Sequence, residues 1–475
     1  MGIKASEGKG MRRPRRSLRY DILLRVAMAM SILAVVTPFS LCWFVYYAQR
    51  VELISSIHRS AGIIGLFTAL YCFFGRVYDA FLISSKRISE LYFSQVLSIL
   101  MADGMMFLVL WLISGGFPHM LPALLALVGQ LLLSALWCRC AQSWYFARFA
   151  GQKAGIVFDV RHGMEDLFGA YGLDKKFDIQ FSCSIEECLA QRMRILNGVD
   201  AVFLCGIHSH ERNTILKYCV KNGIVVYMIP CIGDVLMSGA KQMHMFHLPI
   251  LRAERYHPPI EYRFMKRTFD VVSSAAVIVL TSPVMLAVAI AIKAHDGGPV
   301  FYRQARLTKD GRVFEILKFR SMRIDAEKDG IARLSSGDCD DRITSVGRFI
   351  RASRLDELPQ LFNILFGSMS VVGPRPERPE IAAQYEEEMP EFALRLQAKA
   401  GLTGYAQVYG KYNTIPYDKL QMDLMYISNP SFIEDLKIIF ATIQILFQTE
   451  STEGVAAGRT TASNKANADD SKKSA

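Results

Sequence analysis

Four long apolar stretches occupy the first third of the sequence and constrain its fold more than any other feature. Each is long enough to cross about 30 Å of hydrocarbon as a helix. The 475-residue chain is 51% hydrophobic and carries a formal net charge of +11, a combination typical of membrane proteins with basic flanks. The sequence predicts four N-terminal transmembrane helices within residues 21–148, formed by residues 22–47, 61–83, 92–114 and 120–142.

The positive charges between these stretches predict the side of the membrane on which each connection lies. Residues 1–20 are basic, which places the N-terminus in the cytoplasm. Lys86 and Arg87 place the connection between the second and third stretches on the same side. The turn at residues 115–119 has no Lys or Arg and should lie outside. The chain after the fourth stretch is therefore expected in the cytoplasm.

Residues 150–255 alternate between short β-rich runs and helix-like segments. The β-rich runs are residues 156–158, 179–181, 201–204 and 224–229, with helix-like segments at 185–196 and 211–222. This alternation predicts a parallel α/β sheet. The turn after the first run, Phe158–Gly163, has a single glycine and no G-x-G-x-x-G pattern. We therefore expect a degenerate Rossmann-like domain with a regulatory or scaffolding role.

Residues 268–292 form a fifth apolar segment with Ser282-Pro283 near its middle. Proline removes a helix hydrogen bond and kinks the axis. Both flanks are basic, so both ends should face the cytoplasm. These features predict a re-entrant membrane helix with its break at Ser282-Pro283, where the serine hydroxyl can satisfy a freed carbonyl. The alternative is an ordinary kinked fifth span.

The adjacent carboxylates of Asp356 and Glu357 follow an arginine-rich segment and precede Pro374-Arg375-Pro376. An isolated Asp-Glu pair usually lies on a solvated surface, and arginines at three-residue spacing often line a helix against anionic lipid. Their joint occurrence after an interrupted membrane segment is typical of a site that holds phosphates, a divalent metal and a nucleophile together. The upstream arginines are Arg342, Arg348, Arg351 and Arg354.

Seven motifs in the C-terminal part of the chain occur in the order found in one enzyme family. Residues 262–448, which contain them, closely resemble the bacterial sugar transferase family, the monotopic polyprenyl-phosphate phosphoglycosyl transferases. The upstream blocks make the chain similar to the long-form members that begin exopolysaccharide, capsule or O-antigen repeat units. The motifs are residues 298–304, 314–322, 341–351, 355–361, 372–376, 401–407 and 420–426.

The resemblance implies an activity and two catalytic residues. The family moves a sugar-1-phosphate from a UDP-sugar onto undecaprenyl phosphate with Mg²⁺, through a phosphosugar on an aspartate. This makes Asp356 the nucleophile and Glu357 a metal ligand or acid/base partner, and both are expected to bind Mg²⁺. The resemblance also implies a mostly α-helical catalytic domain with amphipathic helices at the membrane surface.

Four basic residues are the candidates for binding substrate phosphates. Arg351 and Arg375 are the best placed for bidentate contacts, and Lys318 and Arg320 are further candidates. Asp423 matches another polar position of the family motif, with no role assigned.

The expected surroundings of the catalytic domain follow from the same features. Residues 430–447 are amphipathic and should lie in the membrane interface, although a buried packing helix is an alternative. Residues 449–475 are expected to be disordered. The expected partners are a UDP-sugar, undecaprenyl phosphate and membrane lipid; a homodimer is compatible with the sequence, and no nucleic acid is expected. The expected location is the cytoplasmic face of the bacterial inner membrane.

Two other functions fit parts of the sequence. A nucleotide-sugar oxidoreductase or dehydratase would use the α/β domain, but the glycine fingerprint is missing there. A non-catalytic membrane scaffold for polysaccharide assembly would have no need of Lys318, Asp356, Glu357 and Arg375. The transferred sugar is not specified, since no motif reads the sugar ring.

Overall fold

The computed structural model describes residues 18–48, 57–83, 88–148, 151–159, 176–323, 342–410 and 415–446. The chain divides into two compact units, Met1–Ile229 and Pro230–Ala475. Most of the basic N-terminal segment predicted at 1–20, the connection that contains Lys86 and Arg87, and the tail predicted at 449–475 lie outside the described residues.

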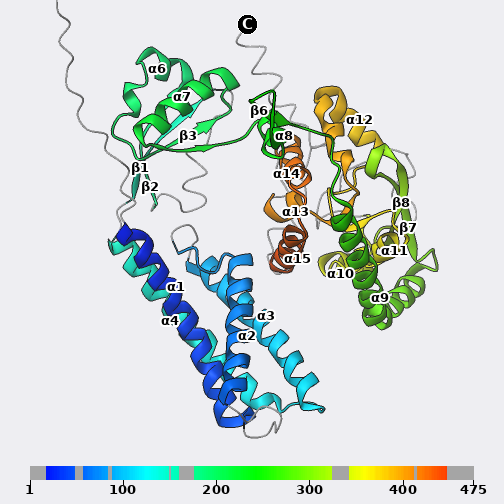
Figure 1. Ribbon diagram of the computed structural model, residues 1–475. Coiled ribbons are helices and arrows are strands. Elements are labelled where there is room, and N and C mark those ends of the chain that lie inside the picture. Colours follow the sequence, from blue (N-terminus) through cyan, green and yellow to red (C-terminus); the bar gives the residue numbers. More distant parts are fainter. Residues whose placement is uncertain are drawn as a thin grey trace, which may run out of the picture. The chain divides into compact units, whose positions relative to one another are not determined.

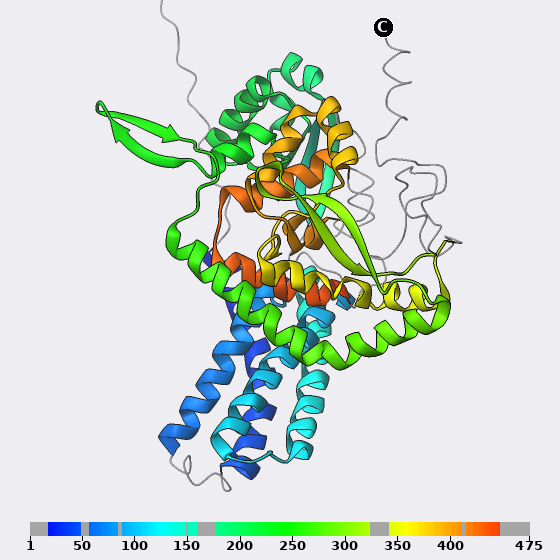
Figure 2. The same cartoon turned by 90° about the vertical axis from the view of Figure 1, so that its right-hand side faces the viewer.

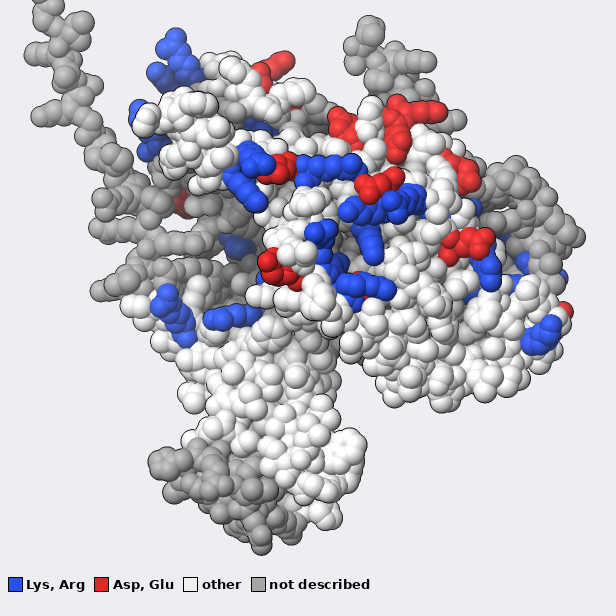
Figure 3. Space-filling model, turned by 45° about the vertical axis from the view of Figure 1, so that its right-hand side comes forward, with Lys and Arg blue, Asp and Glu red and all other residues white. Residues whose placement is uncertain are grey.

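The predicted apolar stretches of the first unit all form helices (Figure 1). Helix α1 packs against α2 and α4, and α3 packs against α2 and α4. The surface of this four-helix block is almost free of charged side chains on the face shown in Figure 3. All four helices are long and apolar enough to cross a membrane. Their bounds are α1 (Leu18–Cys42, continued by the π-helical turn η1, Trp43–Tyr47), α2 (Ile57–Val77), α3 (Ile88–Ser114) and α4 (Met120–Arg148).

A small polar network joins three of these helices inside the block. Tyr71 of α2 donates a hydrogen bond to Gln95 of α3 and lies 2.9 Å from the Ser31 hydroxyl of α1. The Gln95 amide donates in turn to Ser31 Oγ and to the Ala80 carbonyl. Because a polar group without a partner is costly in an apolar environment, this network favours one packing arrangement of the helices.

The α/β part of the first unit contains the predicted parallel sheet. The strands are β1 (Gln152–Phe158), β2 (Phe177–Ser184), β3 (Ala201–Cys205) and β4 (Val225–Met228), in the order β2-β1-β3-β4. Helix α7 (Ser209–Asn222) ends at Gly223, whose φ of 72° only glycine adopts readily. The segment expected as one helix at 185–196 is split into α6 (Ile185–Ala190) and η4 (Arg194–Leu196), because Arg192 and Met193 have positive φ.

The second unit begins at Pro230, earlier than the boundary near residue 255 that the sequence pattern indicates. Helix α8 (Ile232–Ser238) packs against α14 (Pro416–Ser428). The antiparallel pair β5 (Lys241–Met245) and β6 (Leu248–Arg252) follows. These elements, which the sequence pattern groups with the α/β domain, therefore lie in the unit that contains Asp356.

Helix α9 (Ile260–Asp296) is the fifth helix in the described residues that is long and apolar enough to cross a membrane. It continues through Ser282 and Pro283 as one helix and bends along its length (Figure 2). Pro283 has no N–H to donate to the Val279 carbonyl, and the Ser282 hydroxyl donates to that carbonyl at 2.8 Å. The predicted role of this hydroxyl is confirmed. The return of the helix to one leaflet stays a prediction.

The rest of the second unit is mostly helical, with two small sheets. Strands β7 and β8 are antiparallel, and β9 and β10 are parallel. After α9 the elements are β7 (Phe301–Leu307), η5 (Lys309–Gly311), β8 (Val313–Phe319), α10 (Ser345–Ala352), η7 (Leu355–Glu357), α11 (Gln360–Phe366), β9 (Ser370–Val372), α12 (Pro379–Glu388), η8 (Pro390–Gln397), β10 (Gly401–Thr403), α13 (Tyr405–Tyr409), α14 and α15 (Phe432–Leu446).

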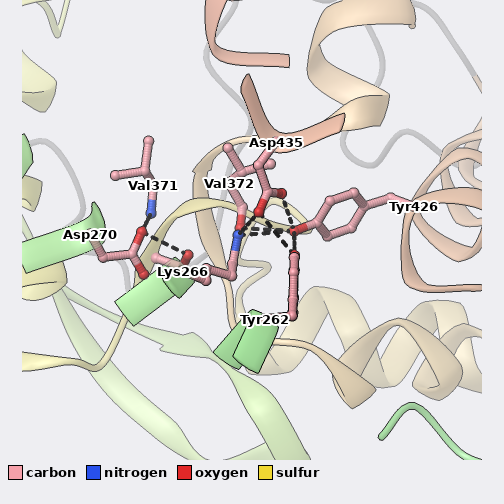
Figure 4. Close-up of polar contacts among 8 residues, drawn as sticks. Tyr262, Lys266, Asp270, Val371, Val372, Tyr426 and Asp435 are labelled. Carbon is pink, nitrogen blue, oxygen red and sulfur yellow. Dashed lines mark hydrogen bonds and ion pairs between the residues drawn. The ribbon is translucent and has the colours of Figure 1, made fainter. Parts of the chain in front are cut away.

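A buried network ties α9, α14 and α15 to β9 (Figure 4). Lys266 of α9 pairs with Asp435 of α15 at 3.0 Å, and their side chains are 16% and 3% exposed. Tyr426 of α14 donates to Asp435 at 2.8 Å. Asp270 of α9 accepts the Val371 amide of β9 at 3.0 Å. The long apolar helix is thereby fixed to the strand that leads into Pro374-Arg375-Pro376.

Candidate active site

Asp356 and Glu357 lie in the short 3₁₀ turn η7, which ends two residues before Pro359. Thr344 caps the preceding helix α10, accepting the Gly347 amide at 2.9 Å. Arg354 then adopts left-handed backbone geometry with a φ of 54°, which ends the helical path and begins the turn. Leu355 packs against a core that includes residues of α9, and this contact holds the turn against that helix.

Glu357 is the residue at which distant parts of the unit meet. Lys318 of β8 donates a hydrogen bond to Glu357 Oε1 at 2.9 Å, and the Arg375 guanidinium lies 3.9 Å from the same oxygen. The Glu357 side chain is 19% exposed. Burial opposes ionisation, but the charges of Lys318 and Arg375 outweigh it and lower the pKa of Glu357 to about 2. Glu357 is therefore ionised throughout the physiological range.

Asp356 has the opposite electrostatic balance. Burial raises its pKa, and the neighbouring charge of Glu357 raises it further. The cations Lys318, Arg351 and Arg354 offset these effects only partly, so the pKa of Asp356 lies at about 6. The two carboxylates are adjacent in sequence, yet they differ strongly in their tendency to hold a proton.

The Lys318 backbone is held by the strand pair β7–β8 and by one buried amide. Residue 318 pairs with Tyr302 across the two strands. Asn363 of α11 accepts the Leu317 amide at 2.9 Å and donates to the Glu315 carbonyl at 2.8 Å. These two bonds fix the edge of β8 directly before Lys318, which positions its ammonium group beside Glu357.

Close backbone packing positions Arg375. Gly373 and Gly401 approach each other so closely that a Cβ on Gly373 would clash with the Lys399 carbonyl, and one on Gly401 with the Gly373 amide. Two glycines are required here because no side chain fits between the segments. The segment that follows β9 is therefore held in one path, and its Arg375 side chain lies near Glu357.

The other predicted phosphate-binding residues occupy different surroundings. Arg351 lies in the last turn of α10 and contributes to the electrostatic environment of Asp356. Arg320 is 8% exposed and forms an ion pair with Asp296, at the end of α9. Its Nη1 atom has no hydrogen bond among the described residues. The structure therefore brings Lys318 and Arg375 onto Glu357 and places Arg351 near Asp356, whereas Arg320 binds the end of the apolar helix.

Asp423 does not contact either carboxylate of the Asp-Glu pair. It is 1% exposed and pairs with Arg395 at 2.7 Å. Sequence reasoning missed Arg395 and its other partner, Glu377. One signal was present: Arg395 stands between Leu394 and Leu396 in a partly apolar run, and a charge in such a run points to a buried ion pair.

The carboxylates fit a magnesium ion that is shared with a phosphate ligand. Mg²⁺ is held through one or two carboxylates together with substrate phosphates. Both ion pairs of Glu357 use Oε1, so Oε2 is the oxygen that this residue can offer beside Asp356. Within the described ranges, no cluster of three His, Cys, Asp or Glu side chains could hold a metal. Phosphate oxygens and water molecules would therefore complete the coordination.

Comparison with known proteins places the site in a family. The model of the family "Bacterial sugar transferase" matches residues 261–449. A UDP-N-acetylgalactosamine-undecaprenyl-phosphate N-acetylgalactosaminephosphotransferase from Aeromonas hydrophila is 38% identical over 239 residues, which are 50% of this chain and 55% of that protein. A UDP-glucose:undecaprenyl-phosphate glucose-1-phosphate transferase from Klebsiella pneumoniae is 42% identical over 183 residues, 38% of this chain and 39% of that protein.

The chain thus spans about half the length of the Aeromonas relative. A third relative, a UDP-glucose:undecaprenyl-phosphate glucose-1-phosphate transferase from Caulobacter vibrioides, is covered more fully. It is 40% identical over 199 residues, 41% of this chain and 74% of that protein. With this coverage, and with the family model matched over the segment that contains Lys318, Asp356, Glu357 and Arg375, the chain belongs to the bacterial sugar transferase family.

Proposed function

We propose that this chain transfers a sugar-1-phosphate from a UDP-sugar to undecaprenyl phosphate and releases UMP. The product is undecaprenyl-diphospho-sugar, and the reaction is the first membrane step in the synthesis of an exopolysaccharide, capsule or O-antigen. The relatives from Aeromonas and Caulobacter, which are named as undecaprenyl-phosphate sugar phosphotransferases, support this class of reaction. The observation that carries the proposal is the meeting of Lys318 and Arg375 at Glu357, directly beside Asp356.

Asp356 is the nucleophile in this proposal. In the first step its carboxylate oxygen bonds to the phosphorus next to the sugar, while the bond to the bridging oxygen breaks and UMP leaves with that oxygen. In the second step a phosphate oxygen of undecaprenyl phosphate attacks the same phosphorus and releases the Asp356 carboxylate. A carboxylate attacks an anionic diphosphate only if the charge repulsion is cancelled.

The cations around the pair serve this cancellation. The positive charges of Lys318 and Arg375 balance the negative charge of Glu357. Those of Arg351 and Arg354 stabilise the ionised form of Asp356. Arg375 is 48% exposed, so its guanidinium remains accessible to a phosphate. Mg²⁺, when bound by Asp356 and Glu357 with a substrate phosphate, supplies further positive charge at the transferred group.

The apolar helices supply access to the lipid substrate. Helix α9 and the amphipathic helix α15 belong to the same unit as the site. We propose that α9 is re-entrant and that α15 lies in the interface, so the site faces the cytoplasmic surface of the inner membrane. There the water-soluble UDP-sugar can meet the phosphate of the lipid.

An assay of UMP release tests the proposal. Purified full-length chain is incubated with undecaprenyl phosphate, Mg²⁺ and each member of a panel of UDP-sugars. At least one UDP-sugar should yield UMP, and Asp356→Asn should lower the turnover by roughly 10⁴-fold. Glu315→Gln, which removes an exposed carboxylate, is the control and should keep its turnover. Absence of UMP with every sugar would overturn the proposed reaction.

A further inference from the structure

Two arginines, the buried Arg395 and the partly buried Arg306, hold the backbone of the Pro374-Arg375-Pro376 segment. Arg395 donates a hydrogen bond to the Arg375 carbonyl at 2.9 Å. Arg306 donates to the next carbonyl, that of Pro376, at 3.0 Å. The prolines have no N–H groups, so carbonyl oxygens are the main backbone atoms by which this segment can be held.

The buried Asp423 and the partly exposed Glu377 hold these arginines in turn. Asp423 Oδ2 accepts from Arg395 Nη2 at 2.7 Å and from Nε at 3.0 Å. Glu377 lies 3.5 Å from Arg395 and 4.0 Å from Arg306. Arg395 and Asp423 are 5% and 1% exposed. A charged group at such depth is stable only when it is paired, so the Asp423 carboxylate fixes the position of the Arg395 guanidinium.

The contacts form one continuous path to the Asp-Glu pair. Asp423 binds Arg395, Arg395 binds the backbone of Arg375, and the Arg375 side chain lies 3.9 Å from Glu357. We infer that Asp423 is a positioning residue that acts through Arg395 to place the Arg375 guanidinium for the substrate phosphates. This inference rests on the proposed function and deepens it, because it assigns Asp423 a role without contact to substrate.

A direct catalytic role for Asp423 predicts a different pattern of mutant effects. If Asp423 acts only through Arg375, its removal costs little once Arg375 no longer makes its normal contacts. If Asp423 touches the reacting atoms, its removal costs the same factor in any background. Residues that act as a unit are non-additive, whereas independent residues multiply.

A double-mutant cycle separates these patterns. Asp423→Asn keeps the size of the side chain and removes its charge, and Arg375→Lys keeps the charge and removes the fork geometry. We expect Asp423→Asn to lower kcat/KM for the UDP-sugar by roughly 100-fold, the effect of displacing a binding group by about 1 Å. The double variant should be close to Arg375→Lys alone. Effects that multiply in the double variant would overturn the inference.

Two further variants keep the cycle interpretable. Ile438→Ala removes a fully buried side chain of the same unit without removing a charge. Its effect should multiply with that of Arg375→Lys, as expected for a general loss of stability. If Asp423→Asn does not fold, Glu377→Gln replaces it in the cycle, since Glu377 also binds Arg395, and the same non-additivity is required.

Hydrogen exchange tests the inference separately from the proposed reaction. If wild-type chain releases no UMP from any UDP-sugar, the proposed function fails, yet the positioning of Arg375 can still be measured. In the full-length protein, Asp423→Asn should speed exchange of the Gly373, Gly401 and Leu307 amides, whose hydrogen bonds hold the segment. The increase should exceed that in Ile438→Ala, since Ile438 packs in the same core as Val372. Equal exchange in wild type and Asp423→Asn would overturn the positioning role.

Discussion

The structure shifts the pKa values of the neighbouring residues Asp356 and Glu357 in opposite directions. Lys318 and Arg375 lower the pKa of Glu357 to about 2, against the effect of burial. Burial and the charge of Glu357 raise the pKa of Asp356 to about 6. Such a divergence often distinguishes the roles of two carboxylates in one site. Here it makes Glu357 a permanent anion and Asp356 the carboxylate whose protonation changes near neutral pH.

A pH dependence of activity follows from these values. The ionised form of Asp356 is the nucleophile, so kcat/KM, which reports the free enzyme, should rise with pH through the pKa of Asp356. That pKa is about 6 in the metal-free chain, and bound Mg²⁺ moves the rise to lower pH. Glu357→Gln removes a charge that raises this pKa, so the rise should move to lower pH, apart from any loss of rate. The measurement is the pH profile of UMP release. Glu315→Gln should leave the profile in place, and an unmoved profile in Glu357→Gln would contradict the electrostatic coupling.

Sequence reasoning identified the residues that meet at the site better than those that support it. Lys318, Asp356, Glu357 and Arg375 were all predicted, and the structure brings them together. The structure pairs Arg320 with Asp296, and its predicted contact with phosphate stays a prediction. The Arg395 network was missed. A buried ion pair depends on which segments the tertiary fold brings together, and local pattern carries little information about that.

At the scale of single elements, α9 shows how a proline is accommodated inside a long apolar helix. Pro283 deprives the Val279 carbonyl of its helical donor, and the Ser282 hydroxyl replaces it at 2.8 Å. The neighbouring Thr281 hydroxyl makes a similar bond to Val277, whose carbonyl also keeps its ordinary backbone donor. The two hydroxyls make similar bonds, but only the Ser282 hydroxyl replaces a missing backbone donor.

This difference predicts the effects of three substitutions. Ser282→Ala should lower the stability of the protein by about 1–3 kcal/mol, because a carbonyl without a donor remains in an apolar setting. Thr281→Val should lower the stability by a smaller amount, because the Val277 carbonyl keeps its backbone donor. Pro283→Ala restores a backbone N–H, so Ser282→Ala should become nearly neutral in that background. Thermal unfolding in lipid nanodiscs measures these effects, and an equal cost of Ser282→Ala with and without Pro283 would contradict the explanation.

The helices and strands with a clear local sequence pattern were predicted correctly, and those without one were not. The four parallel strands and α7 have clear patterns, and Gly223 marks the helix end that the structure shows. The split of the 185–196 segment was not predicted, since Arg192 and Met193 are not residues that favour positive φ. Their conformation is imposed by the packing of the domain, not by their own preference.

For the whole molecule, the division at Ile229 and Pro230 separates the family-specific part from the rest. The family match at residues 261–449 lies within the second unit. In the Caulobacter relative, 199 matched residues make up 74% of the protein, which leaves too little length for both upstream blocks of this chain. The chemistry is therefore expected to depend on the second unit.

A fragment test examines this expectation. Residues 230–475, reconstituted in vesicles, should release UMP with kcat within roughly tenfold of the full chain, because function resides in the site. Residues 1–229 are the control and should release none. A fragment that is folded by circular dichroism but inactive would assign the first unit a part in the reaction.

The most direct measurement is a search for the phosphosugar on Asp356 in the absence of lipid acceptor. Full-length chain is mixed with Mg²⁺ and a UDP-sugar that supports turnover, then quenched and analysed by peptide mass spectrometry. We predict UMP in an amount close to that of the enzyme and a sugar-phosphate mass increase on the peptide that contains Asp356, with neither in Asp356→Asn. No adduct and no UMP until undecaprenyl phosphate is added, or full turnover by Asp356→Asn, would contradict the role of Asp356 as the nucleophile.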